Sequence, residues 1–519
     1  MGRRIILGVE NMEEKKIEER KKIVQTKTTN IIDNYKFESS GIPVEIKIIK
    51  RDDFNPFYEV IIPGVAEYTR IILETTLRAE LISEVKVDIA DILDARKSDQ
   101  IKKKFFEGAL VILDRNFPNL TEDKKRILAS YLLQNALGLG EIEILLSDEK
   151  LEEVVINNSR EPIWVYHKKY GWCKSNLTVK NEETIFDYSS LVARKIGRQI
   201  NILSPLLDAH LPNGDRVNST LSPISHFGNT LTIRKFSRNP WSITTLIKNK
   251  TVSPEVAALI WMCVQNELSL VISGGTGSGK TSFLNSLAGL IPSNQRIISI
   301  EDTRELTLPS FLHWVPMVTR EPNPEGKGEV SMLDLMVNAL RMRPDRIIVG
   351  EIRRQREAEI LFEAMHTGHS VYASLHADNV EQTLSRLTNP PINIPKEMLD
   401  ALAGIVVTFR HRRFNIRRVL EFGEIHKNCD FHIIYRWDIK TDEVKQIAGL
   451  SRIADLLSLY SGMNDHEIKE DLEKKTEILN WMVANDYTGV DQVGRIVSQY
   501  YLDENIIYDL ASNNKKWTV

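Results

Sequence analysis

The residues with the clearest chemistry form one glycine-rich stretch near the middle of the chain. It consists of Gly274, Gly275, Thr276, Gly277, Ser278, Gly279, Lys280 and Thr281. The stretch matches G-x-x-x-x-G-K-[ST] at every fixed position, and it stands between a strand-like and a helix-like segment. Its backbone N–H groups can converge on phosphate oxygens, while Lys280 reaches the β- and γ-phosphates and the Thr281 hydroxyl binds Mg²⁺. The pattern predicts binding of a nucleoside triphosphate rather than a simple glycine-rich turn.

Carboxylates follow two further strand-like segments. Glu351 comes directly after the apolar run 346–350, and Glu301 and Glu305 follow the apolar run 296–300. In open parallel sheets the ligand crevice lies at the carboxyl ends of the strands, so these acids are expected to converge on the nucleotide. Besides the glycine-rich loop, hydrolysis requires an acidic residue near the γ-phosphate and Mg²⁺.

The elements that must position these residues alternate between strands and helices from residue 253 onward. The expected strands cover 268–274, 296–300, 346–350 and 370–376, and the expected helices cover 280–290, 331–342, 354–366 and 379–388. Continuous apolar strands separated by helices indicate a parallel sheet that is buried on both faces. The sequence therefore predicts an α/β P-loop domain over residues 239–425.

The rest of the 519-residue chain is long enough for further domains. We expect a charged segment over 1–34, an α+β region without recognisable chemistry over 35–138, a compact α+β unit over 139–238, and strands followed by a helical subdomain over 426–519. A linker near residues 238–245 is expected to separate the two nucleotide-flanking domains.

Several segments in fixed order resemble the type II/type IV secretion ATPase superfamily. They are the glycine-rich loop and the segments 300–306 (IEDTREL), 346–353 (RIIVGEIR), 366–369 (HTGH) and 374–377 (SLHA). The family names these Walker A, Asp box, Walker B and His box. Upstream, 205–217 and 232–236 resemble the family's PAS-like N-terminal domain. The resemblance covers roughly residues 138–425. It implies a PAS-like N-terminal domain followed in the sequence by a RecA-like ATPase domain.

The resemblance assigns roles to matching positions. Glu351 would be the Walker B acid and, with Thr281, would hold Mg²⁺. Either Glu301 or Glu305 would polarise the attacking water as general base, and the sequence leaves that choice open. His376 would contact the γ-phosphate region. The implied cofactors are ATP and Mg²⁺.

Arginines are the expected partners of a γ-phosphate that develops charge. Arg216 and Arg234 match the positions from which the family's N-terminal domain reaches the nucleotide. Arg320, Arg341 and Arg343 are lesser candidates that also fit ordinary surface roles. His366 and His369 raise a zinc alternative, which is disfavoured because no further ligand stands at the right spacing.

The details of the resemblance point to one branch of the family. Bacterial type II and pilus assembly ATPases commonly carry a four-cysteine zinc insertion, whereas this chain has three scattered cysteines, Cys173, Cys263 and Cys429. The amino-acid sequences of the Asp box and Walker B segments resemble those of the archaeal branch, which includes archaellum and adhesion-pilus motors. The scattered cysteines also predict no disulfide framework.

Composition narrows the function classes. The 68 Lys and Arg residues against 71 Asp and Glu residues leave a net charge of −3. This balance disfavours a nucleic-acid translocase. A translocase would also need a basic run near the loops of the sheet, and we expect none there. No segment reaches the roughly 18 apolar residues of a membrane span. A non-hydrolysing scaffold is disfavoured because the acids are present, and a small-molecule kinase because no acceptor pocket is visible.

The favoured interpretation is a ring-forming, Mg²⁺-dependent ATPase that powers a pilus-like filament or type II-like secretion. The resemblance implies a homo-hexamer, a polytopic membrane platform protein as partner, and a cytoplasmic location at the inner face of the membrane through that partner. A conjugation-type secretion ATPase or a hexameric nucleic-acid translocase remains the alternative. We expect no stable nucleic-acid partner.

Overall fold

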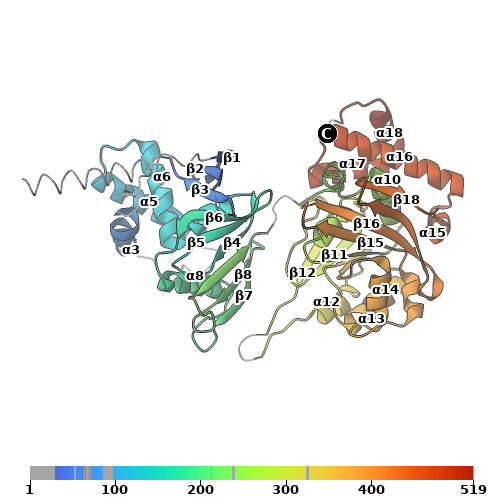
Figure 1. The fold of residues 1–519 in the computed structure, drawn as a ribbon, viewed down its shortest axis with the longest axis horizontal. Coiled ribbons are helices and arrows are strands. Elements are labelled where there is room, and N and C mark those ends of the chain that lie inside the picture. Colours follow the sequence, from blue (N-terminus) through green and yellow to red (C-terminus); the bar gives the residue numbers. More distant parts are fainter. Residues whose placement is uncertain are drawn as a thin grey trace, which may run out of the picture. The chain divides into compact units, whose positions relative to one another are not determined.

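The computed structural model describes residues 30–517 except 52–53, 64, 66–68, 70–71, 86–97, 212, 237–239, 323–325 and 415. Most of the charged segment expected over 1–34 lies outside these residues, as do Pro212 of the PAS-like motif and the centre of the expected linker. The chain divides into two compact units between residues 236 and 237 (Figure 1). Each unit is described by itself.

The N-terminal unit is built on one nine-stranded sheet with the order β1-β2-β3-β6-β5-β4-β9-β8-β7. β3 and β6 pair in parallel and the other neighbours are antiparallel. The strands are β1 (Asn30–Ser39), β2 (Ile42–Lys50), β3 (Phe57–Ile61), β4 (Leu151–Ile156), β5 (Pro162–His167), β6 (Gly171–Thr178), β7 (Leu206–His210), β8 (Arg216–Thr220) and β9 (Thr230–Arg234). The regions expected over 35–138 and 139–238 thus contribute strands to the same sheet.

Alternating apolar residues give this sheet its buried face. In β2, the side chains of Ile42, Val44, Ile46 and Ile48 are buried, while the intervening residues are more exposed. The buried face belongs to one hydrophobic core with the helices of the unit. These helices are α3 (Arg78–Glu84), which continues a π-helical turn over Leu73–Leu77, α5 (Ser98–Asn116), α6 (Glu122–Leu137), α7 (Ile142–Ser147) and α8 (Glu182–Lys195).

The C-terminal unit contains a second nine-stranded sheet with the order β12-β11-β13-β14-β10-β15-β16-β17-β18. The six strands from β12 to β15 are parallel, and the last three pair in antiparallel fashion. The strands are β10 (Leu270–Gly274), β11 (Arg296–Glu301), β12 (His313–Val318), β13 (Arg346–Val349), β14 (Ser370–Leu375), β15 (Gly404–His411), β16 (Ile416–Ile425), β17 (Phe431–Asp438) and β18 (Glu443–Gln446). One strand, β14, separates the glycine-rich-loop strand β10 from β13. This order confirms the predicted RecA-like α/β fold class.

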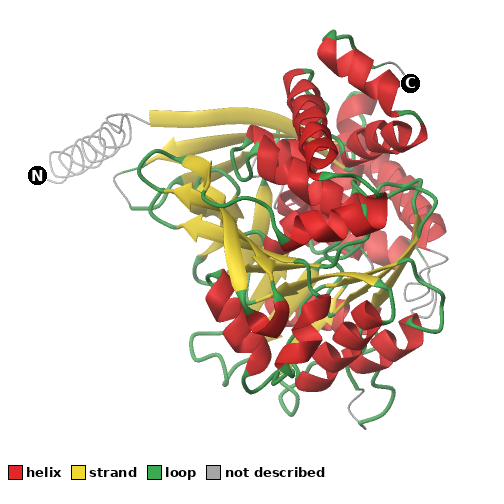
Figure 2. Ribbon diagram, turned by 90° about the vertical axis from the view of Figure 1, so that its right-hand side faces the viewer, coloured by secondary structure: helices red, strands yellow, loops and turns green. Residues whose placement is uncertain are grey.

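Helices cover both faces of this second sheet (Figure 2). One face packs α9 (Ile243–Lys248), α10 (Pro254–Gln265), α11 (Lys280–Ala288), α15 (Arg452–Ser461), α16 (Asp465–Ala484), α17 (Val490–Leu502) and α18 (Glu504–Ser512). The other packs α12 (Met332–Ala339), α13 (Gln355–His366) and α14 (Val380–Thr388). The continuous apolar strands are buried on both sides for this reason. Among the described residues, no helix combines the length and the apolar composition of a membrane span.

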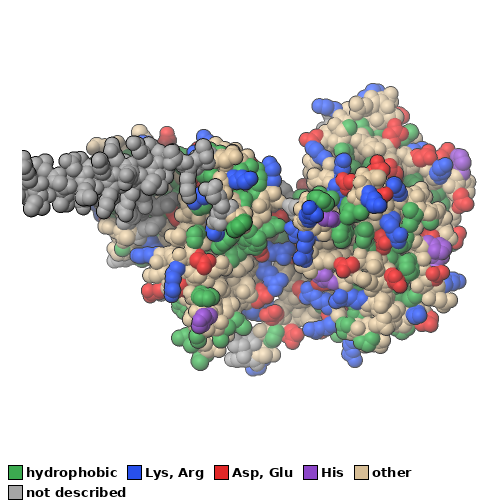
Figure 3. All heavy atoms as spheres, viewed as in Figure 1, with side chains coloured by type: hydrophobic (Ala, Val, Ile, Leu, Met, Phe, Trp, Pro, Cys, Tyr) green, Lys and Arg blue, Asp and Glu red, His purple; other side chains and the backbone are tan. Residues whose placement is uncertain are grey.

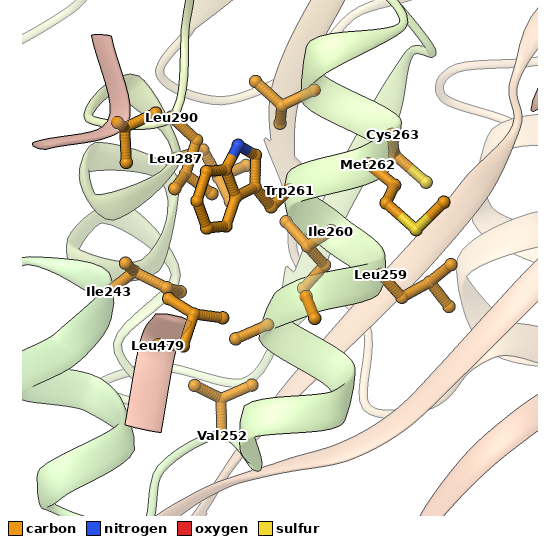
Figure 4. Close-up of a cluster of buried hydrophobic side chains, with 14 of the residues drawn as sticks. Ile243, Val252, Leu259, Ile260, Trp261, Met262, Cys263, Leu287, Leu290 and Leu479 are labelled. Carbon is orange, nitrogen blue, oxygen red and sulfur yellow. The ribbon is translucent and has the colours of Figure 1, made fainter. Parts of the chain in front are cut away.

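The C-terminal helices brace the helix that follows the glycine-rich loop. Trp261 of α10 is fully buried among apolar side chains of α9, α11 and α16 (Figure 4). Its indole N–H donates a 2.8 Å hydrogen bond to the Tyr501 hydroxyl, which donates a 2.6 Å bond to the Leu290 carbonyl just after α11. The subdomain expected after residue 426 therefore supports the position of α11.

Candidate nucleotide-binding site

The predicted residues of the C-terminal unit gather at one edge of its parallel sheet. Lys280 begins the helix after β10, Glu301 ends β11, Glu351 follows β13, and His376 follows β14. Because these strands are parallel, their carboxyl ends lie at the same edge. The fold thereby brings residues separated by about a hundred positions into a single cluster.

At three positions of the loop, Gly274, Gly277 and Gly279, the backbone adopts positive φ angles that favour glycine. Gly277 has φ 72°, in the left-handed region. Gly274 has φ 154°, and a Cβ atom there would lie 2.4 Å from the Thr408 carbonyl oxygen. Ser278 and Thr408 share a 2.9 Å hydrogen bond between their hydroxyls, which ties the loop to β15. The loop is therefore held close against the neighbouring strand.

Lys280 lies beneath this loop and is 9% exposed. Its ammonium donates hydrogen bonds of 2.9 Å to the Gly274 carbonyl and 3.1 Å to the Gly275 carbonyl. The two ring nitrogens of His376 lie 3.3 and 3.4 Å from the same Nζ atom. Burial lowers the pKa of Lys280, and the nearby Glu351 carboxylate opposes that shift.

A chain of ionic contacts continues from His376. The His376 Nε2 atom lies 3.3 Å from Glu351 Oε1. Arg353 donates to the other Glu351 oxygen through Nε at 2.9 Å and Nη2 at 2.6 Å, and its Nη1 atom lies 2.6 Å from Asp302 Oδ2. Asp302, Arg353, Glu351, His376 and Lys280 therefore form one continuous network that joins the Asp box to the glycine-rich loop.

The protonation of His376 follows from its position in this network. Burial is the largest cause of a lowered pKa, and the Lys280 charge acts in the same direction. The Glu351 carboxylate acts in the opposite direction. A neutral imidazole therefore suits the space between an ammonium and a carboxylate.

The two candidate general bases have different surroundings. Glu301 is 2% exposed, and its Oε1 atom accepts the backbone N–H groups of Glu305 at 2.9 Å and Leu306 at 3.0 Å. Its Oε2 atom is buried and accepts no hydrogen bond from the residues that the structure describes. Burial raises the pKa of Glu301 to about 7. Glu305 is exposed, and its charge acts on Lys280.

The donor set at this edge fits a hard divalent cation. Thr281 supplies a hydroxyl in the first turn of α11, and Glu351 supplies a carboxylate that is 18% exposed. Mg²⁺ prefers oxygen ligands, usually one or two protein groups together with phosphate oxygens and water. These residues would hold Mg²⁺, which when bound neutralises phosphate charge.

Arg216 and Arg234 belong to the N-terminal unit. They lie directly opposite each other on the antiparallel strands β8 and β9, and both are exposed. Arg216 makes two hydrogen bonds to the Asp208 carboxylate, at 3.1 and 2.6 Å. Arg234 also lies opposite Glu153 of β4, and the two side chains interact electrostatically, so each arginine has a carboxylate neighbour in its own unit.

The other predicted arginine and histidine candidates bond to nearby backbone carbonyls or lie away from the glycine-rich loop. Arg320 donates a 2.6 Å hydrogen bond to the Gly328 carbonyl. Arg341 and Arg343 precede β13, at the sheet edge opposite to the glycine-rich loop. His366 Nε2 lies 3.1 Å from the Met398 carbonyl, and His369 Nδ1 lies 3.2 Å from the Ala364 carbonyl. Within the described residues, neither histidine joins a group of three metal-ligating side chains.

A basic run borders the glycine-rich loop, contrary to the sequence-based expectation. The β15–β16 hairpin contains five arginines in nine residues, namely Arg410, Arg412, Arg413, Arg417 and Arg418. The Arg417 Nε atom donates a 3.1 Å hydrogen bond to the Gly277 carbonyl. Lys and Arg side chains gather on the face of the C-terminal unit that Figure 3 shows. A nearly neutral total charge conceals this local patch, which the run 410–418 alone could have revealed.

Sequence reasoning also missed the role of Arg353 and Asp302. Both residues lie within the Walker B and Asp-box segments, but the resemblance assigns them no role. Their contact bridges β13 and β11 through side chains 51 positions apart. A pattern within one segment cannot reveal such a contact, although an arginine two residues after a strand-end acid was a usable signal.

Comparisons with known proteins identify a family and several relatives. Residues 142–410 match the family described as "Type II/IV secretion system protein". An uncharacterized protein of Methanocaldococcus jannaschii is 34% identical over 411 residues, which cover 76% of this chain and 73% of that protein. The type IV secretion system protein PtlH of Bordetella pertussis is 29% identical over 299 residues, covering 51% of this chain and 87% of PtlH. Among solved structures, one match is the crystal structure of the VirB11 ATPase from the Brucella suis type IV secretion system in complex with sulphate. Its sequence is 25% identical, and the match has a TM-score of 0.28 and covers 55% of this chain and 92% of VirB11.

Proposed function

The chain belongs to the type II/IV secretion system protein family, and from that premise we propose that it is a Mg²⁺-dependent, ring-forming ATPase. Its hydrolysis would power assembly of a pilus-like filament or type II-like secretion. The observation that carries the proposal is the network from Asp302 to Lys280 at the end of the glycine-rich loop. The network supports the proposal because it gathers the Lys280 ammonium and the Glu351 carboxylate beside the glycine-rich loop, and charges of these kinds bind nucleotide phosphates and their metal ion in P-loop enzymes.

Four residues of the network, together with Thr281, have definite tasks in this proposal. Lys280 moves its ammonium from the loop carbonyls to the β- and γ-phosphate oxygens. Glu351 and Thr281 hold the metal, which supplies charge neutralisation when bound. Arg353 fixes the Glu351 carboxylate through two hydrogen bonds, and His376 stands between Glu351 and Lys280, where it senses the γ-phosphate. Positioning and electrostatic stabilisation account for most of the catalysis in phosphoryl transfer.

We assign the general base to Glu305 and a positioning role to Glu301. The Glu301 carboxylate accepts two backbone N–H groups of the Asp-box turn and thereby fixes the course of that turn. Glu305 is exposed, and its charge acts on Lys280. A solvent-exposed carboxylate can orient and deprotonate water, whereas one oxygen of the Glu301 carboxylate is held by the turn and the other is buried.

The active form is proposed to be a homo-hexamer in which Arg216 and Arg234 approach the γ-phosphate of a nucleotide. Their opposed, exposed guanidinium groups support this role. We place the ring in the cytoplasm at the inner face of the cell membrane, where it would act on a polytopic platform protein. Family membership supports a partner of this kind.

Steady-state phosphate release by the purified full-length chain tests the assignment. Lys280→Ala removes a charge-assisted contact worth roughly 1.5–3 kcal/mol in binding, so turnover should fall to background. Lys248→Ala is the matched control, because Lys248 is an exposed lysine of the same unit that pairs with Asp486. Normal turnover in the Lys280→Ala variant would refute the proposed site.

A nucleic-acid translocase is the second candidate, and the basic β15–β16 hairpin is the observation that favours it. Arg412 and Arg413 are exposed at its turn, beside the P-loop contact of Arg417. Duplex DNA would then stimulate hydrolysis, and the stimulation would fall steeply between about 50 and 200 mM salt. The double variant Arg412→Ala/Arg413→Ala would lose that stimulation. ATPase activity that is indifferent to DNA at low salt excludes this candidate.

A further inference from the structure

A second cluster of chemically capable side chains lies in the C-terminal unit, away from the glycine-rich loop. Glu424 on β16 is fully buried, and His432 on β17 is its direct cross-strand partner. His426 follows two residues after Glu424. The Glu424 Oε1 atom lies 3.1 Å from His426 Nε2 and 3.9 Å from His432 Nδ1, and the two imidazole centroids are 4.5 Å apart.

The other oxygen of this carboxylate is firmly held. Glu424 Oε2 accepts the backbone N–H groups of Ser451 at 3.2 Å and Ile453 at 3.1 Å, at the start of α15. The neighbouring Arg452 directs its guanidinium to the carbonyls of Leu402 and Ile425. These contacts fix the orientation of Oε1 toward the two imidazoles. Anchoring hydrogen bonds of this kind typically orient the carboxylate ligands of metal sites.

We propose that Glu424, His426 and His432 form a binding site for a divalent transition-metal ion of the Zn²⁺ class. The three ligand atoms lie within 4.8 Å of one another. Tetrahedral Zn²⁺ with bonds of about 2.0–2.1 Å places its ligand atoms roughly 3.4 Å apart, so small rotations of the two rings complete the site. Two imidazoles and one carboxylate suit Zn²⁺, and water would take the fourth position.

A metal ion can enter the site from the solvent on the side of the two histidines. The side chain of His432 is 56% exposed and that of His426 is 23% exposed, whereas Glu424 forms the closed end of the site. A buried carboxylate beside two imidazoles gains a strong partner when a cation binds between them. Metal binding would release any proton carried by the imidazoles.

The site lies at the opposite end of the strands from the proposed ATP site. Glu424 pairs with Gly404 at the start of β15, and Gly404 pairs with Leu270 at the start of β10. The glycine-rich loop follows the other end of β10. A metal ion here would therefore act as a clamp between β16, β17 and the first turn of α15, and it would secure the C-terminal helices to the sheet. This inference does not depend on the proposed ATPase activity.

Titration of the metal-stripped full-length protein with Co²⁺, in the absence of nucleotide, tests the proposal. We expect one Co²⁺ per chain with the visible absorption of a four-coordinate ion, and displacement of that ion by one equivalent of Zn²⁺. We also expect Zn²⁺ to raise the midpoint of thermal unfolding, because a ligand that binds only the folded state stabilises it. The variants His426→Ala and His432→Ala should each bind Co²⁺ at least about tenfold more weakly.

Two control variants separate this site from other histidines. His466→Ala changes an exposed histidine of α16 that pairs with Glu470, and it should bind Co²⁺ as the unaltered chain does. His376→Ala removes the imidazole of the nucleotide site and should also leave the absorption band in place. Because the side chain of His432 is more than half exposed, His432→Ala should unfold at the same temperature as the unaltered chain when no metal is present.

Three results would overturn the proposal. They are the absence of a four-coordinate Co²⁺ band, an unchanged affinity in both the His426 and the His432 variants, and loss of the band in the His376→Ala variant. Each would leave Glu424 as a carboxylate that only caps α15 and pairs with histidine. None of them would alter the outcome of the phosphate-release experiment, so the two proposals fail separately.

Discussion

The backbone N–H of Glu305 donates a 2.9 Å hydrogen bond to the carboxylate of Glu301. The two acids that the motif leaves equivalent are therefore unequal in the folded chain. One is buried and holds the turn, and the other is exposed at the tip of that turn. This relationship divides their roles and leads to the first prediction.

Glu305→Gln should lower the turnover number by roughly 10²–10⁴-fold, the usual contribution of a positioned general base. Glu301→Gln should lower it less than about tenfold, because the amide oxygen can still accept the two backbone N–H groups. Single-turnover phosphate release on both variants, with ATP affinity measured in parallel, checks this. The reverse order of the two effects would make Glu301 the base.

Glu301 also predicts a pH dependence of stability. Its pKa is about 7 in the folded chain against an ordinary 4.5, so the folded state binds the proton more tightly than the unfolded state does. The contribution of Glu301 is therefore most favourable below pH 4.5 and is lost as the pH rises through 7, and its full size is on the order of 3 kcal/mol.

Differential scanning fluorimetry of the unaltered chain and of Glu301→Gln between about pH 5 and pH 8.5 measures this effect. The variant should unfold at a temperature that rises relative to the unaltered chain as the pH increases. A difference in unfolding midpoint that is constant over this range would show that Glu301 titrates normally.

Glu351→Gln should retain ATP binding and lose hydrolysis. The amide keeps the shape of the side chain but cannot carry the negative charge that pairs with the Arg353 guanidinium and would hold Mg²⁺. Equilibrium binding of a fluorescent ATP analogue beside phosphate release separates the two properties. Glu381→Gln, an exposed acid in the first turn of α14, is the control. Equal loss of binding and turnover would make Glu351 a structural residue.

Specific activity should rise with protein concentration if Arg216 and Arg234 act within a ring. An arginine finger can contribute roughly 10³–10⁵-fold in other P-loop enzymes, and a nucleotide bound at an interface favours assembly by mass action. Light scattering with a non-hydrolysable ATP analogue, together with activity over a dilution series, measures both properties.

Arg194→Ala is the matched control for Arg216→Ala and Arg234→Ala. Arg194 is an exposed arginine of the same unit, and the hydrogen bond described for its side chain is a local one to the Ser190 carbonyl. Its activity should match that of the unaltered chain, while the other two variants assemble but hydrolyse slowly. Flat activity per chain in a protein that stays monomeric would refute the ring.

The sequence determined the features that depend on local backbone chemistry. The glycine-rich loop requires glycine at positions such as Gly277, whose φ is positive, so the residue types alone mark the loop. The strands around it are continuously apolar because helices cover both faces of their sheet. Parallel strands then place the residues at their carboxyl ends along one edge, and for this reason the amino-acid sequence alone groups Glu351 with Lys280. His376 was predicted only from the family resemblance.

The tertiary structure decided the features that depend on burial and on strand register. Glu301 and Glu305 have the same chemistry in the sequence, and only packing makes one of them buried. Arg417 reaches the Gly277 carbonyl only because β15 returns beside the loop strand. Likewise, Glu424 meets His432 through the register of β16 against β17, which shifts at an irregularity between Phe422 and Gly423. A displacement of one residue in that register would turn the side chain to the other face of the sheet, and no local pattern specifies such a long-range alignment.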